Sequence, residues 1–212
     1  MNLVAKGLFI TFEGSDGSGK STQLALAEAF LTEKGYKVTV TREPGGTVIS
    51  EKIRELLLDR RHSEMTGRTE TLLYAAARAQ HVDEVIRPAL NRGDIVICDR
   101  FTDSSIAYQG YGRRLGADVE TINGFATGEC KPDMTFFLKI SPQAAGKRIK
   151  DLDRDRLESE RDGFYSEVFK GYEALEQKHP DRITAIDSSK TIEEVHAKIR
   201  EKLEARLKEI NY

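Results

Sequence analysis

The sequence contains the stretch Gly14-Ser15-Asp16-Gly17-Ser18-Gly19-Lys20-Ser21-Thr22, which fits the pattern G-x-x-x-x-G-K-[ST] and directly follows the apolar run 8–12. Glycines let the backbone N–H groups of such a loop turn toward one point at the N-terminus of a helix, where the helix dipole favours an anion. A helical pattern follows over residues 21–33. The stretch therefore predicts a strand, a phosphate-binding loop and a helix, in that order.

Two side chains of this loop have predicted chemical roles. Lys20 would reach the β- and γ-phosphates of a nucleotide, and the Ser21 hydroxyl would bind the Mg²⁺ that the nucleotide carries. A glycine-rich turn can match the pattern by chance, but here the preceding strand and the following helix supply the context that the motif requires. The sequence therefore indicates a nucleotide-binding protein, with ATP binding assigned to all nine residues of the loop.

Length and composition indicate one soluble α/β domain that spans residues 1–212. The chain is 39% hydrophobic and 32% charged, and its net charge of −2 gives no basic footprint for nucleic acid. Cys98 and Cys130 show no metal-type spacing and are expected as small core residues in a reducing cytosol. The start of the chain is too polar for a signal peptide, and no run is long enough to cross a membrane. We expect a cytoplasmic protein with no nucleic-acid or membrane partner.

Short apolar runs alternate with longer helical patterns, which is typical of a parallel sheet with helices on both faces. The predicted strands are 8–12, 38–41, 95–98, 135–140 and 182–186. The predicted helices are 21–33, 47–58, 69–90, 118–126, 142–150, 164–177 and 191–210. Between them, the segment 147–161 crowds acids and bases together without apolar periodicity and is interpreted as a lid. The prediction is a doubly wound, five-stranded parallel sheet with a lid segment.

Charged residues follow the second and third predicted strands at the point where each strand ends. In an open α/β sheet the ligand crevice lies at the carboxyl ends of the strands, so Arg42, Asp99 and Arg100 are expected to converge beside the phosphate loop. Asp99 ends an apolar strand, an arrangement that helps hold Mg²⁺ in phosphate-loop proteins. Each of these residues, taken singly, also fits a polar loop cap with no ligand. Together they predict a ligand crevice.

Two arginines facing Lys20 concentrate positive charge unless an anion occupies the crevice. Arg42 and Arg100 suit a second phosphate, because a guanidinium can grip it with two hydrogen bonds. A donor triphosphate opposite an acceptor phosphate describes a nucleoside monophosphate kinase. A switch GTPase fits poorly, because the near-match to a guanine motif at residues 91–94 precedes a strand instead of following one. A non-catalytic nucleotide-binding scaffold remains an alternative from the motifs alone.

Five further motifs occur in the order found in thymidylate kinases. They are Phe12-Glu13-Gly14, Thr41-Arg42-Glu43-Pro44-Gly45-Gly46-Thr47, Tyr74-Ala75-Ala76-Ala77-Arg78-Ala79-Gln80, Asp99-Arg100 and Ser104-Ser105-Ile106-Ala107-Tyr108-Gln109-Gly110. The chain resembles that family over its whole length. The resemblance implies a P-loop NTPase fold, ATP-dependent phosphorylation of dTMP to dTDP with Mg²⁺, and a homodimer. Another nucleoside or deoxynucleoside monophosphate kinase is the alternative.

The resemblance also implies roles for individual residues. It assigns dTMP binding to Asp16, Arg42, Tyr74, Arg78, Arg100, Ser105, Tyr108 and Gln109. Tyr74 would stack on the thymine, Arg78 and Gln109 would hydrogen-bond its edge, and Ser105 would lie near a ring nitrogen. Arg42 and Arg100 would hold the phosphate, Asp16 would lie near the 3′-hydroxyl or the phosphates, and Tyr108 would lie under the sugar. From the residues alone, Tyr74 also fits a core aromatic and Gln109 a loop amide.

The source of catalytic charge is a further implication of the resemblance. Some thymidylate kinases carry arginine in the phosphate loop where this chain has Gly17, and members with glycine supply that charge from a basic lid. The catalytic assignment is Lys20, Arg100, Arg154 and Arg156. Arg148 of the same segment would stack on adenine, and Ser21 with Asp99 would hold the metal. The acids of the segment leave open that it is an ordinary solvated charged face.

Overall fold

The computed structural model describes residues 7–148, 156–157 and 162–210. Its strands are β1 (Leu8–Glu13), β2 (Val38–Arg42), β3 (Ile95–Asp99), β4 (Met134–Lys139) and β5 (Ile183–Asp187). The helices and helical turns are α1 (Lys20–Glu33), α2 (Val48–Leu58), α3 (Gly67–His81), η1 (Val82–Ile86), α4 (Arg87–Asn91), α5 (Thr102–Ser105), η2 (Ile106–Gly112), α6 (Asp118–Thr127), α7 (Pro142–Gly146), α8 (Asp162–Lys178) and α9 (Ile192–Glu209). Every predicted strand is present, with ends that differ from the prediction by at most one residue.

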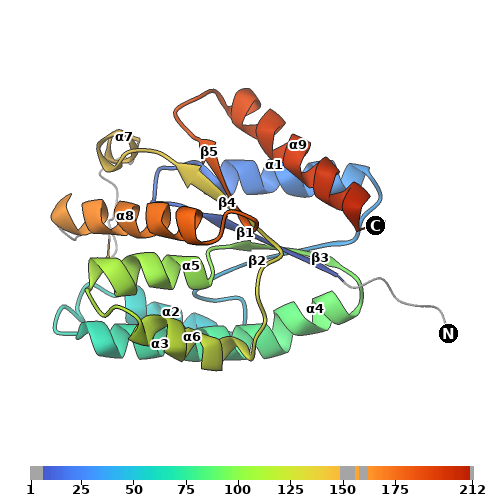
Figure 1. Ribbon diagram of the computed structural model, residues 1–212. Coiled ribbons are helices and arrows are strands. Elements are labelled where there is room, and N and C mark those ends of the chain that lie inside the picture. Colours follow the sequence, from blue (N-terminus) through green and yellow to red (C-terminus); the bar gives the residue numbers. More distant parts are fainter. Residues whose placement is uncertain (1–6, 149–155, 158–161, 211–212) are drawn as a thin grey trace.

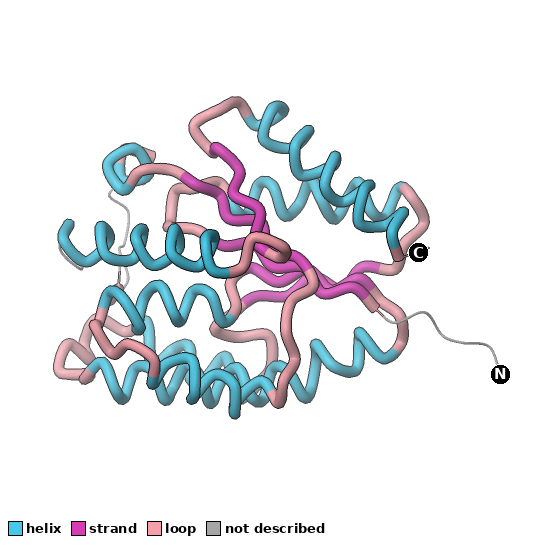
Figure 2. Tube along the Cα trace, in the orientation of Figure 1, coloured by secondary structure: helices cyan, strands magenta, loops and turns pink. Residues whose placement is uncertain are grey.

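The five strands form one parallel sheet in the order β2-β3-β1-β4-β5. Helices α1 and α9 cover one face of the sheet, and α2 to α6 with α8 lie on the other side (Figure 1). Figure 2 shows the strands enclosed between these two helical layers. A crossover between parallel strands requires a helix on a face of the sheet, so this alternation of elements produces the layering. The prediction of a doubly wound, five-stranded parallel sheet is confirmed.

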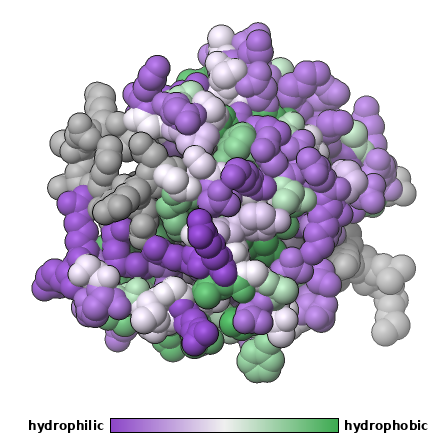
Figure 3. Space-filling model, turned by 60° about the vertical axis from the view of Figure 1, so that its left-hand side comes forward, coloured by the Kyte–Doolittle hydropathy of each residue, from purple (hydrophilic) through white to green (hydrophobic). Residues whose placement is uncertain are grey.

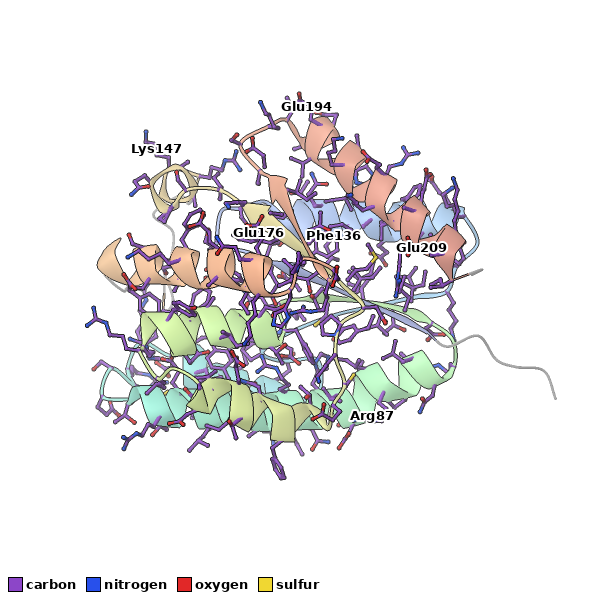
Figure 4. All side chains as sticks on the ribbon, in the orientation of Figure 1. Arg87, Phe136, Lys147, Glu176, Glu194 and Glu209 are labelled. Atoms are coloured by element: carbon purple, nitrogen blue, oxygen red, sulfur yellow. The ribbon has the colours of Figure 1, made fainter. Side chains whose placement is uncertain are left out.

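The core divides into two faces because successive side chains of a strand point to opposite sides of the sheet. Leu8, Ile10 and Phe12 of β1 pack with the buried faces of α1 and α9, whereas Phe9 packs on the other face with η1 and α4. Phe136 of β4 is fully buried and lies in the interior of the molecule (Figure 4). Burial of such large apolar side chains is the main favourable contribution to folding.

Two sequence predictions need correction in the helices. Helix 69–90 is interrupted by η1, a π-helical turn that precedes Pro88 in α4. Proline cannot donate the backbone hydrogen bond of a regular helix and crowds the carbonyl one turn earlier, so a local change of pitch at this place relieves both problems. The predicted helix 142–150 is shorter than expected, because α7 spans only Pro142–Gly146.

Helices α5 and η2 were not predicted from the sequence. Their residues carry no clear apolar period, and Gly110 and Gly112 weaken any helical pattern. Tertiary packing on α8 compensates, because Gly171 of α8 lets the backbone of η2 approach closely. A β-carbon at Gly171 would lie 2.9 Å from the α-carbon of Ala107. Contacts that are distant in sequence therefore stabilise this helical stretch.

The strand register brings the carboxyl ends of three strands to one level. Asp99 of β3 pairs with Phe12 of β1 on one side and with Arg42 of β2 on the other. The phosphate loop follows β1 directly, so the end of β1 and the charged ends of β2 and β3 meet at one edge. This edge positions the candidate site.

Candidate nucleotide-binding site

The loop between β1 and α1 has the backbone shape that a phosphate-binding loop requires. Gly14, Gly17 and Gly19 have positive φ angles of 138°, 77° and 91°, which residues with a β-carbon rarely adopt. The Lys20 ammonium reaches back over the loop and donates hydrogen bonds of 3.1 Å to the carbonyl oxygens of Gly14 and Ser15. The loop therefore brings a helix N-terminus and a lysine to one place.

The charge of Lys20 is poised to respond to a ligand. Burial and the nearby Arg100 guanidinium lower the pKa of Lys20 to about 8, and the carboxylates of Asp16 and Asp99 oppose this shift only in part. A bound phosphate adds negative charge that stabilises the ammonium form and so raises this pKa. Protonation of Lys20 and binding of a phosphate group are therefore coupled.

This coupling predicts that ATP affinity falls as the pH rises through about 8 in the absence of acceptor. Below that pH Lys20 is already an ammonium; above it, binding must take up a proton, so the dissociation constant should rise by up to about tenfold per pH unit. Calorimetric titration with ATP at a series of pH values measures this directly. Arginine stays charged over the whole pH range, so in Lys20→Arg the dissociation constant for ATP should no longer rise above about pH 8. An equal rise of the dissociation constant in Lys20→Arg would show that another group causes the pH dependence.

Two adjoining cavities lie beside the loop. A larger one of about 350 Å³ is lined by Asp16, Gly17, Gly19, Lys20, Ser21, Thr22, Arg42, Glu43, Arg54, Asp99 and Arg100. A smaller one of about 110 Å³ is lined by Asp16, Glu43, Pro44, Arg54, Leu58, Tyr74, Arg78, Arg100, Ser104, Ser105, Tyr108, Gln109 and Leu157. The two share Asp16, Glu43, Arg54 and Arg100 as a common wall. A ligand in one cavity can therefore meet a ligand in the other.

Arg100 dominates the common wall. Its backbone is in the left-handed region, with φ of 68°, and its N–H donates to the carbonyl oxygen of Phe12 at 2.9 Å. Its guanidinium donates to Asp16 Oδ1 at 2.6 Å and lies 5.2 Å from the centre of the Tyr108 ring. Burial alone would raise the pKa of Asp16, but Arg100 and Lys20 outweigh it and lower the pKa. Asp16 thus stays ionised between two cations.

Asp99 and Ser21 fit a Mg²⁺ ion that enters with a nucleotide. The Oδ1 atom of Asp99 is buried and has no hydrogen-bond partner within the described part of the chain. Asp99 and Ser21 line the same cavity as Lys20. Carboxylate and hydroxyl oxygens suit Mg²⁺, which usually keeps several waters and binds few protein ligands. No cluster of three or more His, Cys, Asp or Glu that could hold a metal occurs among the described residues.

Arg78 lies in the wall of the smaller cavity and is only 2% exposed. Its Nε donates to Glu43 Oε2 at 2.7 Å and its Nη1 donates to Ser105 Oγ at 2.9 Å. It also donates to the Asn123 side-chain oxygen and, through Nη2 at 3.0 Å, to the Phe101 carbonyl. These contacts hold the guanidinium plane and use four of its five N–H groups. The fifth belongs to Nη2.

Three more expected dTMP-binding residues lie around the smaller cavity. Tyr74 is half-buried in its wall. Gln109 is 1% exposed, and its Nε2 donates to Glu70 Oε1 at 2.8 Å. The Tyr108 hydroxyl is buried and has no hydrogen-bond partner among the residues that the structure describes. A buried hydroxyl without a partner is costly, so the cavity is suited to a polar ligand at this point.

Arg42 lines the larger cavity but not the smaller one. Its side chain is 46% exposed and donates to the Pro44 carbonyl at 2.9 Å and to Glu51 Oε2 at 3.0 Å. Arg54, which the sequence analysis did not single out, lines both cavities and donates to the same Pro44 carbonyl at 2.9 Å. Arg54 thus belongs to the wall that both cavities share, whereas Arg42 lines only the larger cavity.

The arginines of segment 147–161 have different surroundings. Arg148 lies beside the phosphate loop, where its Nη2 donates to the Ser188 carbonyl at 2.9 Å. Arg156 is 8% exposed and donates to the Leu57 carbonyl at 2.9 Å and to Glu70 Oε2 at 2.7 Å. Arg154 lies outside the described residues. The guanidinium of Arg156 is thus engaged by a buried carboxylate.

Buried acids around the site were missed by sequence reasoning. Glu13 is the last residue of β1 and accepts from Phe101 N at 2.7 Å and from Ser104 Oγ at 2.6 Å, which fixes the turn that carries Arg100. Burial and the Asp103 carboxylate raise the pKa of Glu13 to about 7. The position of Glu13 at a strand end was an available signal.

A second missed acid is Glu43. It lies between the Arg78 guanidinium and the buried imidazole of His81, whose Nδ1 is 2.9 Å from Glu43 Oε1. The sequence analysis assigned no role to His81, yet it is fully buried and its Nε2 is also 2.6 Å from Thr41 Oγ1. Only the tertiary structure brings these three groups together. Glu43 itself had a signal, since it belongs to the motif at residues 41–47.

A strand, a phosphate loop with its lysine and a second arginine-lined cavity across a shared wall define the class of P-loop nucleoside monophosphate kinases. The family model for thymidylate kinase matches residues 12–199. The chain belongs to the thymidylate kinase family.

Individual relatives agree with this assignment. A thymidylate kinase of an Exiguobacterium species is 52% identical over 189 residues, which cover 88% of this chain and 89% of the relative. The thymidylate kinase of Lactobacillus delbrueckii subsp. bulgaricus is 50% identical over 197 residues, which cover 91% of this chain and 93% of the relative. The crystal structure of thymidylate kinase from Ehrlichia chaffeensis matches with a TM-score of 0.77 and 35% identity, over 93% of this chain and 98% of the other.

Proposed function

We propose that the chain binds ATP with Mg²⁺ in the larger cavity and dTMP in the smaller one, and transfers the γ-phosphoryl group to give dTDP and ADP. The observation that carries this proposal is the wall shared by the two cavities, with Arg100 and Asp16 at its centre. Phosphoryl transfer needs mainly positioning and charge neutralisation. An oxygen of the acceptor phosphate forms a bond to the γ-phosphorus, while the bond from that phosphorus to the β–γ bridging oxygen breaks.

The smaller cavity is proposed as the dTMP site. Tyr74 stacks on the thymine, Arg78 and Gln109 hydrogen-bond its edge, and Ser105 lies near a ring nitrogen. Arg42 and Arg100 hold the phosphate, and Asp16 lies near the sugar 3′-hydroxyl or the phosphates. For Arg78 the proposal rests on its remaining Nη2–H group, because its other N–H groups bind protein oxygens.

The larger cavity is proposed as the donor site. Residues 14–22 bind the phosphates, Lys20 stabilises the transferring group, and Ser21 and Asp99 hold Mg²⁺ directly or through water. When bound, Mg²⁺ neutralises charge on the β- and γ-phosphates. Arg148 is proposed for the adenine, which its position beside the loop supports.

The chain is proposed to belong to the subgroup with Gly17 in the loop and a basic lid over 147–161, within one domain. Arg154 and Arg156 would then add charge for the transferring phosphoryl. To do so, Arg156 must exchange its contacts with Glu70 and Leu57 for contacts with the nucleotide. The exchange would remove one of the cations that neutralise Glu70.

Tyr108 is predicted to select deoxyribose. Its ring lies in the wall of the smaller cavity with its hydroxyl buried. Tyr108→Phe should keep the preference for dTMP over its ribonucleotide counterpart, because ring bulk excludes the 2′-hydroxyl. Tyr108→Ala should lower the ratio of kcat/KM values by about tenfold or more, the scale for losing a shape contact in a pocket, and should weaken dTMP. The ratio staying at its parental value in the alanine variant would refute steric exclusion.

Acceptor specificity tests the proposed function. We expect ADP formation from ATP with dTMP to exceed that with UMP or dGMP, and dUMP to be used less well than dTMP, in a coupled assay at equal concentrations. A preference for dGMP or UMP would indicate a different monophosphate kinase. ATP hydrolysis that no acceptor stimulates would indicate a nucleotide-binding protein without this activity.

A homodimer is proposed from an apolar surface on α2, α3 and α6. The exposed side chains on these helices are Val48 (73%), Ile49 (52%), Leu56 (47%), Leu72 (57%) and Phe125 (93%). In Figure 3, hydrophobic side chains are interspersed with hydrophilic ones along the lower part of the molecule, the level at which these helices lie in Figure 1. Large exposed apolar side chains gathered on neighbouring helices are typical of an interface.

None of the described helices is long and apolar enough to span a membrane. We propose a cytoplasmic location because the proposed substrates, ATP and dTMP, are cytoplasmic metabolites.

A further inference from the structure

Glu70 of α3 is a fully buried carboxylate at the centre of a four-residue cluster. Its Oε1 accepts from Gln109 Nε2 at 2.8 Å. Its Oε2 accepts from Arg113 Nη2 at 2.9 Å and from Arg156 Nη2 at 2.7 Å. Glu70 does not line the smaller cavity, whereas Gln109 does. Gln109 is therefore the hydrogen-bond partner through which Glu70 is connected to the cavity wall.

The surroundings of Glu70 keep it ionised. Burial alone would raise the pKa of Glu70, but the hydrogen bonds from Arg113, Gln109 and Arg156 and the charge of Arg113 outweigh burial and lower it. An ionised carboxylate accepts hydrogen bonds and cannot donate them. The group that Gln109 turns toward Glu70 must therefore be its NH₂ group, which fixes the orientation of the amide.

We propose that Glu70 is a positioning residue that sets the hydrogen-bond polarity of the acceptor-base pocket. By holding the NH₂ group of Gln109, it leaves the amide carbonyl oxygen as the group that faces the base. This inference rests on the proposed dTMP site and deepens it, since it names the feature of the base that the site reads.

The fixed amide favours a base that carries a ring N–H group. Thymine and uracil have an N–H at ring position 3 between two carbonyl oxygens, so the Gln109 carbonyl oxygen can accept from that N–H. The Nη2–H of Arg78 can donate to a neighbouring carbonyl oxygen of the base. Cytosine has a lone pair at position 3 and an amino group at position 4, so it would place acceptor against acceptor and donor against donor. A site that leaves buried polar groups mismatched rejects the wrong base strongly.

The test compares dUMP with dCMP, which differ in this edge and share the sugar and phosphate. Dissociation constants for both are measured by calorimetry in the parent and in Glu70→Gln. The parent should prefer dUMP by about a hundredfold or more, the scale for a hydrogen-bonding site that rejects a mismatched analogue. In Glu70→Gln the new amide can pair with either end of Gln109, so the preference should fall by about tenfold or more.

Arg113→Gln is the matched control. Arg113 contacts the same carboxylate and does not line the cavity. This variant should lower the melting temperature and leave the dUMP preference unchanged, because Gln109 keeps its contact with Glu70. If Glu70→Gln leaves the buried arginines unbalanced and does not fold, the double variant Glu70→Gln with Arg113→Gln restores the charge balance and should show the same loss of preference.

An unchanged preference in a folded Glu70→Gln variant would overturn the proposal, as would an equal loss of preference in Arg113→Gln. Failure of the proposed function looks different, because the parent would then bind neither dTMP nor dUMP or would transfer no phosphoryl group. Binding is measured without turnover, so the role of Glu70 is tested independently of the reaction rate.

Discussion

Lys20→Ala is expected to lower kcat by about a hundredfold or more at saturating ATP, the scale for losing one preorganised electrostatic group at the reacting centre. The Lys20 side chain lies over the phosphate loop and is 6% exposed, so solvent screens its charge only weakly. Burial lowers the pKa of Lys20 to about 8, which means that the folded protein destabilises the charged form of this side chain. Removing the side chain should therefore leave the fold intact. Single-turnover measurements give the rate, and thermal melting checks the fold.

Lys34→Ala provides the control for this substitution. Lys34 lies at the other end of α1 and its side chain is 42% exposed, so the same change there should leave kcat near the parental value. A kcat of Lys20→Ala within a few-fold of the parental value would contradict the assignment of the phosphate loop to the reaction.

Arg100→Ala should lower kcat/KM for dTMP by about a hundredfold to a thousandfold, within the range for a lost transition-state donor. Arg100 is one of the two arginines in the wall that the two cavities share, and it donates a hydrogen bond to Asp16 at 2.6 Å. Its loss removes a contact to the acceptor phosphate and leaves Asp16 with Lys20 as its remaining cation. Because both nucleotides meet at this wall, kcat should fall together with kcat/KM.

Arg42→Ala and Arg200→Ala are the comparison variants for Arg100→Ala. Arg42 lines only the larger cavity and is 46% exposed, so its loss should cost less, about tenfold in kcat/KM. Arg200 is exposed on α9, across the sheet, and its loss should have no kinetic effect. Should Arg100→Ala change only the KM for ATP, the assignment of Arg100 to the acceptor phosphate would be wrong.

The strands and the residues at their ends could be predicted from local sequence patterns. A parallel strand that is buried on both faces is a short apolar run with polar residues at its end, so β1 and β3 could be recognised without tertiary information. The same logic placed Asp99 and Arg100 at the crevice, because the carboxyl ends of parallel strands share one edge. The phosphate loop adds a motif whose chemistry depends on consecutive residues.

Long-range contacts explain what could not be predicted. Glu70 binds Gln109 and Arg156, which follow it by 39 and 86 residues, and no local period links such positions. Burial of an ionised group requires partners, but the sequence does not say which residues they are. For the same reason Arg156 could be expected at the transferring phosphoryl, although here it contacts Glu70. Helix η2 escaped prediction because its stability comes from packing on Gly171 of α8.

Transfer of a labelled γ-phosphoryl group is the most direct test of the shared wall between a donor and an acceptor phosphate. The protein is incubated with ATP labelled in its γ-phosphate, Mg²⁺ and dTMP, and the products are separated by chromatography. We expect the label in dTDP, in an amount equal to the ADP formed. In Arg100→Ala we expect the formation of labelled dTDP to be lost. Label that appears only as inorganic phosphate, or dTDP formation that Arg100→Ala leaves unchanged, would contradict transfer across this wall.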